Sequence, residues 1–154
     1  MGEALAKAGY GVINGGYGGT MAAAAAAARE AGGHTIGVTC SLFTFRSGPN
    51  PYCAEVIEAP TLAARLEEMI TRAAAYVVLP GGNGTLAELS LAWEHQRKEL
   101  LPVRPLVAWE EPWRRIVRVL EEGPYLGGGG SDLISWVSDA ESAVAAVRAG
   151  VPGR

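Results

Sequence analysis

Leu79-Pro80-Gly81-Gly82-Asn83-Gly84-Thr85 lies between a short apolar run and a segment whose apolar residues have helical spacing, and this junction decides the fold. A glycine-rich turn from strand to helix exposes backbone N–H groups at a helix N-terminus, where the helix dipole favours an anion. Glycine also lets a phosphate approach the backbone closely. Thr85 either adds a hydroxyl donor or caps the helix. The stretch predicts a nucleotide-phosphate site at the edge of a Rossmann-like sheet.

A second glycine cluster, Asn14-Gly15-Gly16-Tyr17-Gly18-Gly19-Thr20, also follows an apolar run and precedes a segment with helical spacing. One Gly-x-Gly alone is as compatible with a tight turn as with a ligand. Two such clusters favour a phosphate or nucleotide site, because the carboxyl ends of parallel strands meet at one edge of a doubly wound sheet.

Short apolar runs alternate with longer amphipathic stretches along the chain. This alternation predicts repeated βα units, and hence an α/β fold of the Rossmann-like three-layer α/β/α type with a mostly parallel sheet. The expected strands are 10–14, 35–39, 55–58, 76–79, 106–109 and 134–137. The expected helices are 19–31, 62–72, 85–97, 113–121 and 140–148.

The length of 154 residues predicts a single nucleotide-binding domain over 1–154. A doubly wound sheet normally opens with a strand. Residues 2–8 instead have the spacing of a helix that leads into the strand at Tyr10, so we expect the usual first strand to be lacking.

Two stretches, 41–54 and 123–131, contain the proline and glycine expected of surface loops. Arg46 in the first of them is a weaker candidate for a substrate contact. The alanine run 22–28 predicts a helix with small side chains, which can pack closely on the sheet or on a partner.

The charge and apolar pattern limit the classes of partner. The net charge is −3 and the pI about 5.4, which argues against binding to nucleic acid or to an anionic membrane. No apolar run reaches the roughly 18 residues of a membrane span. The start of the sequence lacks the basic and apolar segments of a secretory signal, so we expect a cytoplasmic protein.

Metal and cofactor chemistry finds little support in the sequence. Cys40 and Cys53 form no Cys-x-x-Cys pair, and with two histidines no zinc-ligand spacing is present. The only lysines, Lys7 and Lys98, lie in no context typical of a Schiff-base lysine, which argues against pyridoxal-phosphate chemistry.

Topology adds a cation to the predicted site. A helix that precedes a parallel strand runs back across the sheet, so the first turn of helix 62–72, which carries Arg65, is expected beside the Pro80 loop. Glu88 follows Gly84 by four residues, or about 6 Å along the helix axis. We therefore expect a crevice flanked by a cation and a carboxylate.

The stretch 80–88 resembles the LONELY GUY (LOG) family, the cytokinin-activating nucleoside-monophosphate phosphoribohydrolases whose bacterial members are often labelled possible lysine decarboxylases. Its specific part is Pro80-Gly81-Gly82-Asn83-Gly84-Thr85-Leu86-Ala87-Glu88, which matches the family's Pro-Gly-Gly-x-Gly-Thr-x-x-Glu (PGGxGT) motif. The segment Gly15-Gly16-Tyr17-Gly18-Gly19-Thr20-Met21 and the pair Arg65 and Met69 support the resemblance, which covers nearly the whole chain.

The resemblance implies hydrolysis of the N-glycosidic bond of a nucleoside 5′-monophosphate, AMP or an N6-modified AMP, to free base and ribose 5-phosphate. It implies Arg65 and Glu88 as the catalytic pair, a homodimer, and no metal or other cofactor. The residues expected to bind the substrate phosphate are Gly81, Gly82, Asn83, Gly84 and Thr85. The other expected substrate contacts are Gly15, Gly16, Gly18, Gly19 and Met69.

Two positions depart from the family pattern. Family members commonly have a lysine after the arginine and a second glutamate before the catalytic one, whereas Leu66 and Ala87 stand here. These departures bear on substrate choice and efficiency. A non-catalytic nucleotide- or cofactor-carrier protein on the same fold is therefore the first alternative, because fold alone does not fix activity.

Two further alternatives stay open. The spacing Gly82-x-Gly84-x-x-Ala87, with Glu110 at the end of the next strand, also fits an NAD-binding fingerprint. Against it, the motif comes late in the chain, and no substrate domain is evident. Arg65 is alternatively a surface residue that pairs with Glu67 or Glu68 on its own helix.

Overall fold

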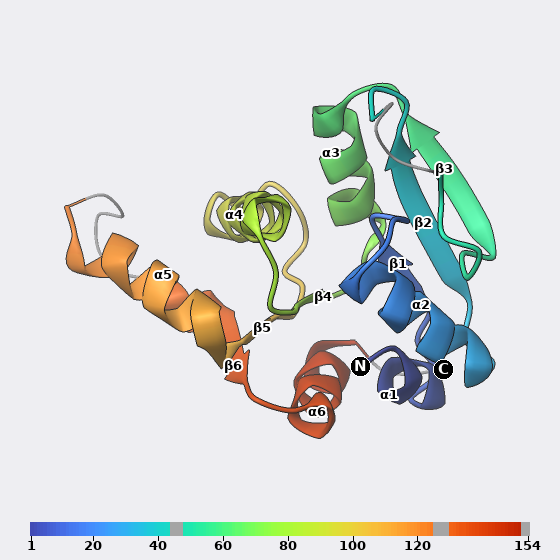
Figure 1. Ribbon diagram of the computed structural model, residues 1–154. Coiled ribbons are helices and arrows are strands. Elements are labelled where there is room, and N and C mark those ends of the chain that lie inside the picture. Colours follow the sequence, from blue (N-terminus) through green and yellow to red (C-terminus); the bar gives the residue numbers. More distant parts are fainter. Residues whose placement is uncertain (44–47, 125–129, 152–154) are drawn as a thin grey trace. The chain divides into compact units, whose positions relative to one another are not determined.

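The computed structural model describes residues 1–43, 48–124 and 130–151, and the chain divides into two compact units (Figure 1). The first unit comprises Met1–Ala73 and the second Ala74–Pro152. Arg46 and residues 125–129 of the two predicted loops lie outside the described residues.

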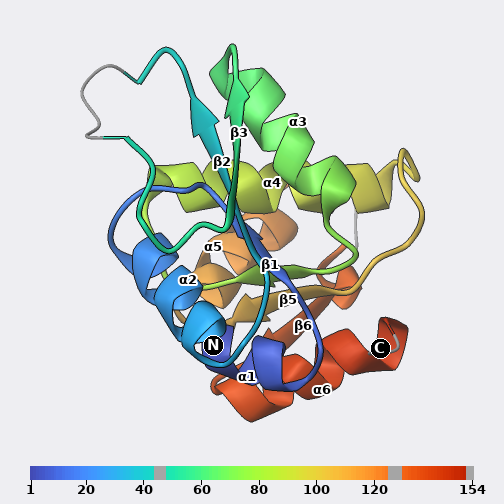
Figure 2. The same ribbon diagram turned by 90° about the vertical axis from the view of Figure 1, so that its right-hand side faces the viewer.

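Three parallel strands and three helices build the first unit. In chain order they are α1 (Gly2–Lys7), β1 (Val12–Asn14), α2 (Thr20–Glu30), β2 (Thr35–Cys40), β3 (Glu55–Ala59) and α3 (Leu62–Arg72). The strand order is β1-β2-β3, and the register places Val38 beside Ile57. Strands β2 and β3 lie side by side in both views, and α3 runs along them (Figures 1 and 2).

The alanine-rich helix α2 packs closely on α1 (Figure 2). A Cβ at Gly2 would lie 1.9 Å from the carbonyl oxygen of Ala24, so the two backbones are in contact there. Ala25 and Ala28 on α2 are completely buried. The small side chains of α2 therefore serve close helix packing inside the first unit, and the predicted helix is confirmed.

The second unit repeats the βα pattern. Its elements are β4 (Tyr76–Val78), α4 (Asn83–Arg97), β5 (Leu106–Trp109), α5 (Glu110–Glu122), the 3-10 turn η1 (Ser131–Leu133), β6 (Ile134–Val137) and α6 (Ala140–Gly150). The strand order is β4-β5-β6, again parallel, with α5 and α6 both packed on β5 and β6. The core of this unit includes Leu89, Leu106, Val107, Trp113 and Val117, all at most 2% exposed.

The predicted fold class is confirmed: the protein is α/β, and every strand pairing among the described residues is parallel, in two three-stranded sheets flanked by helices. The predicted strands and helices all form. The largest difference is at α5, which begins at Glu110 rather than Trp113 and contains Glu111 with non-helical backbone angles. Pro112 is tolerated there because the first turn of a helix needs no N–H from its proline.

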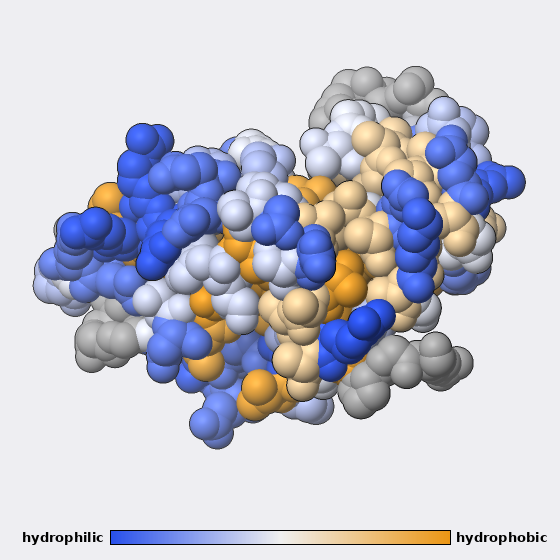
Figure 3. All heavy atoms as spheres, turned by 90° about the horizontal axis from the view of Figure 1, so that it is seen from below, coloured by the Kyte–Doolittle hydropathy of each residue, from blue (hydrophilic) through white to orange (hydrophobic). Residues whose placement is uncertain are grey.

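The face of the molecule that is seen from below has a mixed surface (Figure 3). Hydrophilic and hydrophobic residues are interspersed on the face that Figure 3 presents. Within the described ranges, no helix combines the length and the apolar content needed to cross a membrane.

The start of α3 provides a test of the fold, because this helix carries Arg65. The hydroxyl oxygen of Thr61 accepts a hydrogen bond of 3.1 Å from the N–H of Ala64 and caps the helix. Thr61→Ala is expected to lower the free energy of unfolding by about 1 kcal/mol, measured by urea unfolding under circular dichroism. Thr61→Ser keeps the oxygen and is the control. Equal midpoints for the two variants would show that the cap contributes nothing.

Candidate functional site

The first glycine turn connects β1 to α2 and is held by its own side chains. Asn14, the last residue of β1, accepts a hydrogen bond of 2.9 Å from the N–H of Gly16 and donates one of 3.1 Å to the carbonyl of Met21. Asn50 closes the turn from the loop after β2: its side chain donates to the carbonyl of Tyr17, and its N–H donates to the carbonyl of Gly16 at 2.7 Å. The turn therefore has a fixed shape.

The predicted ligand-contacting glycines of this turn separate into two kinds. Gly15 and Gly16 are buried, and Gly16 has a φ of 72° with Gly37 directly beside it, where a Cβ would lie 3.2 Å from the Gly37 Cα. Gly18 and Gly19 are exposed, and a Cβ at either would meet no atom within 4 Å. The backbone of Gly18 and Gly19 is therefore open to a ligand, and the predicted substrate contacts of Gly15 and Gly16 stay predictions.

Helix α2 begins without a side-chain cap. Its N-cap residue is Gly19, with a φ of 64°, which has no side chain to accept a hydrogen bond from the first turn. The first N–H groups of an α-helix have no partner within the helix. This start of α2 therefore has the features of an anion-binding helix N-terminus, as the sequence predicts.

Arg65 is a buried cation, only 6% exposed. Its Nε–H donates a hydrogen bond of 2.8 Å to the carbonyl of Val38 on β2. The guanidinium carbon lies 5.7 Å from the centroid of the Tyr17 ring and 6.0 Å from that of Phe43. Both distances are within the range of cation–π attraction. The alternative that Arg65 is a surface residue is wrong; on the same helix, Glu68 pairs with Arg72 instead.

Gly15 is a glycine because Arg65 occupies the space of its side chain. A Cβ at Gly15 would lie 1.8 Å from Nη2 of Arg65 and 2.7 Å from Sδ of Met21. The first glycine turn and Arg65 are thus in direct contact. The structure brings these predicted site residues together inside the first unit.

Two other side chains of this unit, Met69 and Cys53, are fully or partly buried. Met69, one helical turn after Arg65, is 8% exposed. Its predicted contact with substrate stays a prediction. Burial raises the pKa of the half-buried Cys53 thiol, whose Sγ lies 3.6 Å from the side-chain oxygen of Asn50, so this thiol is protonated at neutral pH.

The second glycine turn connects β4 to α4 in the second unit. Gly82 is the N-cap of α4, and no side chain caps the helix. Thr85 is therefore not the cap, and that alternative is wrong. Its hydroxyl lies over Gly81 instead, where a Cβ would be 2.3 Å from Oγ1. Gly81, Gly82, Asn83 and Gly84 are all exposed. Their N–H groups and the first N–H groups of α4 form the second candidate anion site.

Glu88 lies on the same helix as this turn. It is the sixth residue of α4 and half-buried. A rise of about 1.5 Å per residue puts it about 6 Å along the axis from Gly84. The second unit by itself therefore carries an exposed glycine turn and a carboxylate on one helix.

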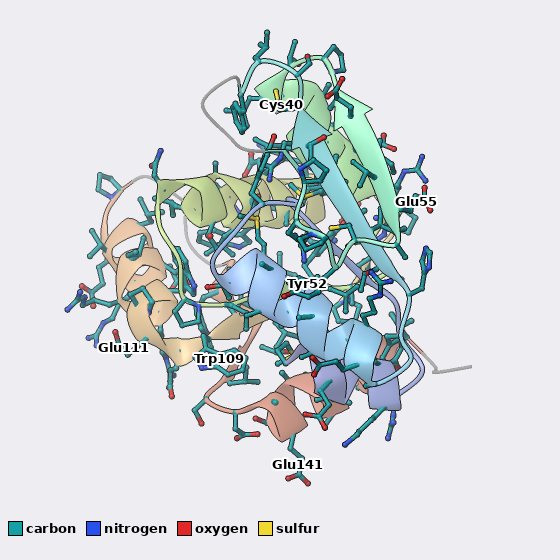
Figure 4. All side chains as sticks on the ribbon, turned by 45° about the vertical axis from the view of Figure 1, so that its right-hand side comes forward. Cys40, Tyr52, Glu55, Trp109, Glu111 and Glu141 are labelled. Atoms are coloured by element: carbon teal, nitrogen blue, oxygen red, sulfur yellow. The ribbon has the colours of Figure 1, made fainter. Side chains whose placement is uncertain are left out.

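Trp113 supports this second turn from α5. Its indole N–H donates a hydrogen bond of 2.9 Å to the carbonyl of Leu79, the residue that follows β4, and its side chain is 1% exposed. Nearby, Trp109 and Glu111 mark the start of α5 (Figure 4). Glu110, the acid of the NAD-binding alternative, forms an ion pair with Arg114 on its own helix.

No sequence pattern identifies several of these supporting residues as part of the site. Nothing in the spacing connects Tyr17 or Val38 with Arg65, or Trp113 with Leu79. One available signal concerned Arg65 itself: it precedes Met69 by four residues, and residues so spaced share a helix face. In the described part of the chain, no group of three or more His, Cys, Asp or Glu side chains could hold a metal ion.

The second turn yields a pair of matched glycine variants. Gly81→Ala places a methyl group against Thr85 and is expected to lower the free energy of unfolding by about 1–3 kcal/mol. Gly84→Ala enters open space inside α4 and is expected to raise it by roughly 0.5–1 kcal/mol, because alanine favours helix. Thermal unfolding measures both. A Gly81→Ala variant at least as stable as wild type would contradict the described loop geometry.

Comparisons with known proteins identify the family of the chain. The family model described as "Possible lysine decarboxylase" matches residues 21–147, a range that contains Arg65, the second glycine turn and Glu88. The cytokinin riboside 5′-monophosphate phosphoribohydrolase of Mycobacterium tuberculosis is 39% identical over 94 residues, 60% of this chain and 50% of that protein. The protein of the same name from Mycobacterium marinum is 36% identical over the same shares.

Among solved structures, the molybdenum cofactor carrier protein of Chlamydomonas reinhardtii is similar over 96% of this chain and 81% of its own, with 26% identity and a TM-score of 0.73. The chain spans about half the length of the curated phosphoribohydrolases that it matches. Because the family model covers far more than half of the sequence, the chain belongs to the family described as possible lysine decarboxylase, the LOG family.

Proposed function

We propose that the protein hydrolyses the N-glycosidic bond of a nucleoside 5′-monophosphate, AMP or an N6-modified AMP, and releases the free base and ribose 5-phosphate. The observation that carries the proposal is the start of α4, where an uncapped glycine turn and Glu88 occur on one helix. The names of the Mycobacterium relatives support the same activity.

The 5′-phosphate is proposed to bind at the exposed second turn. The backbone N–H groups of residues 81–85 and the hydroxyl of Thr85 are the donors, and the dipole of α4 adds a favourable field of about 0.3–1 kcal/mol. Binding there fixes the sugar relative to Glu88. Positioning of this kind contributes strongly to catalysis, because the reacting groups are already held in the geometry that the reaction needs.

Glu88 is the proposed catalytic carboxylate. In the reaction, the bond between C1′ of the ribose and the base nitrogen breaks, water oxygen bonds to C1′, and a proton goes to the base. The transition state resembles an oxocarbenium ion, which a carboxylate stabilises directly. Glu88 fits three roles in this step: holding ribose hydroxyls, activating the water, or stabilising the positive charge.

Arg65 is the proposed second catalytic residue, on the basis of its place in the family pattern. A guanidinium stabilises negative charge that develops on a departing base, or the charge of the phosphate. Its burial beside Gly15 supports a functional role, because an arginine is seldom so fully buried. The exposed backbone of Gly18 and Gly19 and the thioether of Met69 complete the proposed substrate contacts.

A homodimer is part of the proposal. Its basis is the family resemblance, and light scattering at several protein concentrations tests it. A monomer at all concentrations would contradict the proposed homodimer and would leave the proposed reaction unchanged.

The second candidate function is that of a cofactor or nucleotide carrier. It is favoured by the similarity over 96% of the chain to the Chlamydomonas reinhardtii molybdenum cofactor carrier protein. A carrier needs the N–H donors of the two glycine turns but no carboxylate for hydrolysis. The two functions therefore differ in their need for Glu88.

Glu88→Gln tests the proposal. Incubation of the wild-type protein with AMP and with an N6-modified AMP is expected to release free base, detected by chromatography. Glu88→Gln is expected to lower the rate by roughly 10²–10⁴-fold, because the amide cannot carry the charge of the carboxylate or take a proton from water. Nucleotide binding, measured by calorimetry, is expected to stay within about threefold of wild type, because the donors of the turn are unchanged.

The matched control is Glu94→Gln on the same helix. Glu94 is about half exposed and pairs with Arg97 and Lys98, so its loss is expected to leave the rate unchanged. Release of base by Glu88→Gln at the wild-type rate would remove Glu88 from the mechanism. Tight binding without product in the wild-type protein would establish the carrier function instead.

A further inference from the structure

We propose that Tyr17 is a positioning residue for Arg65: its phenol, anchored to the end of β2, forms the surface on which the guanidinium rests. The functional meaning of this inference rests on the proposed function, in which Arg65 is catalytic. Tyr17 lies inside the first glycine turn, between Gly16 and Gly18.

The anchor of the phenol is a pair of backbone hydrogen bonds. The N–H of Cys40 donates to the Tyr17 hydroxyl at 2.9 Å, and the hydroxyl donates to the carbonyl of Cys40 at 3.4 Å. Tyr17 is 5% exposed and Cys40 4%. Figure 4 labels Cys40 at the carboxyl end of β2, with Glu55 toward the opposite end of the β2–β3 pair. The hydroxyl therefore ties the glycine turn to the end of that strand.

The same strand also fixes Arg65. The acceptor of the Arg65 Nε–H is the carbonyl of Val38, two residues before Cys40 on β2. The hydrogen bond fixes the Nε edge of the guanidinium, and the guanidinium carbon lies over the Tyr17 ring, 5.7 Å from the ring centroid. Because both hydrogen bonds are made to β2, the positions of the Tyr17 ring and of the guanidinium are fixed relative to this strand and hence to each other. Gly15 further limits the movement of the guanidinium, since a Cβ at Gly15 would lie 1.8 Å from Nη2 of Arg65.

The Phe43 ring extends this surface. Its centroid lies 5.8 Å from that of Tyr17 at an interplanar angle of 41°, and 6.0 Å from the guanidinium carbon. Tilted aromatic pairs of this kind attract each other, as do a cation and a ring face. Phe43 lacks a hydroxyl and is half-buried, so Tyr17 is the ring with a fixed position.

The test follows the Arg65 Nε–H by ¹⁵N-resolved NMR, which needs no enzymatic activity. The signal is assigned by its loss in Arg65→Lys, which has no Nε. Gly15→Ala serves as the positive control for a displaced guanidinium, because its Cβ would collide with Nη2. In the wild-type protein the Nε–H is expected to exchange slowly with solvent, since it is buried and bonded to Val38.

Tyr17→Leu is expected to speed exchange of the Arg65 Nε–H at least about tenfold, while the backbone N–H of Arg65, bonded to Thr61 in α3, keeps its protection. Tyr17→Phe keeps the ring and is expected to lie between Tyr17→Leu and wild type. Tyr76→Phe is the matched control: Tyr76 is 7% exposed, and its hydroxyl accepts a hydrogen bond from Arg104 in the second unit. It is expected to leave the Arg65 signal unchanged.

Two results would overturn the proposal. One is an Nε–H that stays protected in Tyr17→Leu. The other is equal loss of protection at the Nε–H and at the backbone N–H, which would make Tyr17 a packing residue only. If Tyr17→Leu does not fold, Tyr17→Phe decides the question. An Nε–H exchange rate equal to that of wild type would then show that the Tyr17 hydroxyl does not help to position Arg65.

Kinetics separate this inference from the proposed function. If the wild-type protein hydrolyses AMP, Tyr17→Leu is expected to lower kcat by about 10–100-fold with a smaller change in KM, and Tyr17→Phe to recover most of the loss. An unchanged kcat in Tyr17→Leu would contradict positioning of a catalytic Arg65. If the wild-type protein releases no base, the proposed function fails, and the exchange measurement still decides the role of Tyr17.

Discussion

The first N–H groups of a helix that follows a parallel strand have no partner inside the helix, and the N-cap residues of α2 and α4, Gly19 and Gly82, have no side chain that could supply one. Both helices start at glycines whose backbone is exposed. Elsewhere in the chain, α3 and α6 are capped by the side chains of Thr61 and Asp139. Helices α1 and α5 also lack a side-chain cap, but among these four described helices only α2 and α4 start at exposed glycine turns, and the candidate site depends on this difference.

Each unit adds one charged group to its own turn. In the first unit the contact is direct, because the guanidinium of Arg65 occupies the space that a side chain at Gly15 would need. In the second unit Glu88 is carried on the helix that the turn begins. A buried cation is costly unless it is bonded and packed, and the carbonyl of Val38 and the ring of Tyr17 meet that requirement. Strand β2 therefore holds the proposed catalytic cation in place: its Val38 carbonyl bonds Arg65, and its Cys40 backbone anchors the Tyr17 ring.

The sequence predicted the elements well because strand and helix periods differ and glycine marks the turns between them. It could not choose between a cap and a donor for Thr85, since both use the same hydroxyl at the same position; the structure places the cap at Gly82. It also could not connect Tyr17 with Arg65. That contact joins a turn, a strand and a helix that are distant in the chain, and no spacing rule encodes it.

The central claim is that the start of α4 binds the phosphate of a nucleotide. The most direct measurement is a titration of ¹⁵N-labelled protein with ribose 5-phosphate, followed by the backbone N–H signals. If this claim holds, saturable shifts are expected that are largest at Asn83, Gly84 and Thr85, because these N–H groups lie at the uncapped first turn. Saturable binding that leaves these three signals unmoved, or no binding at all, would contradict it.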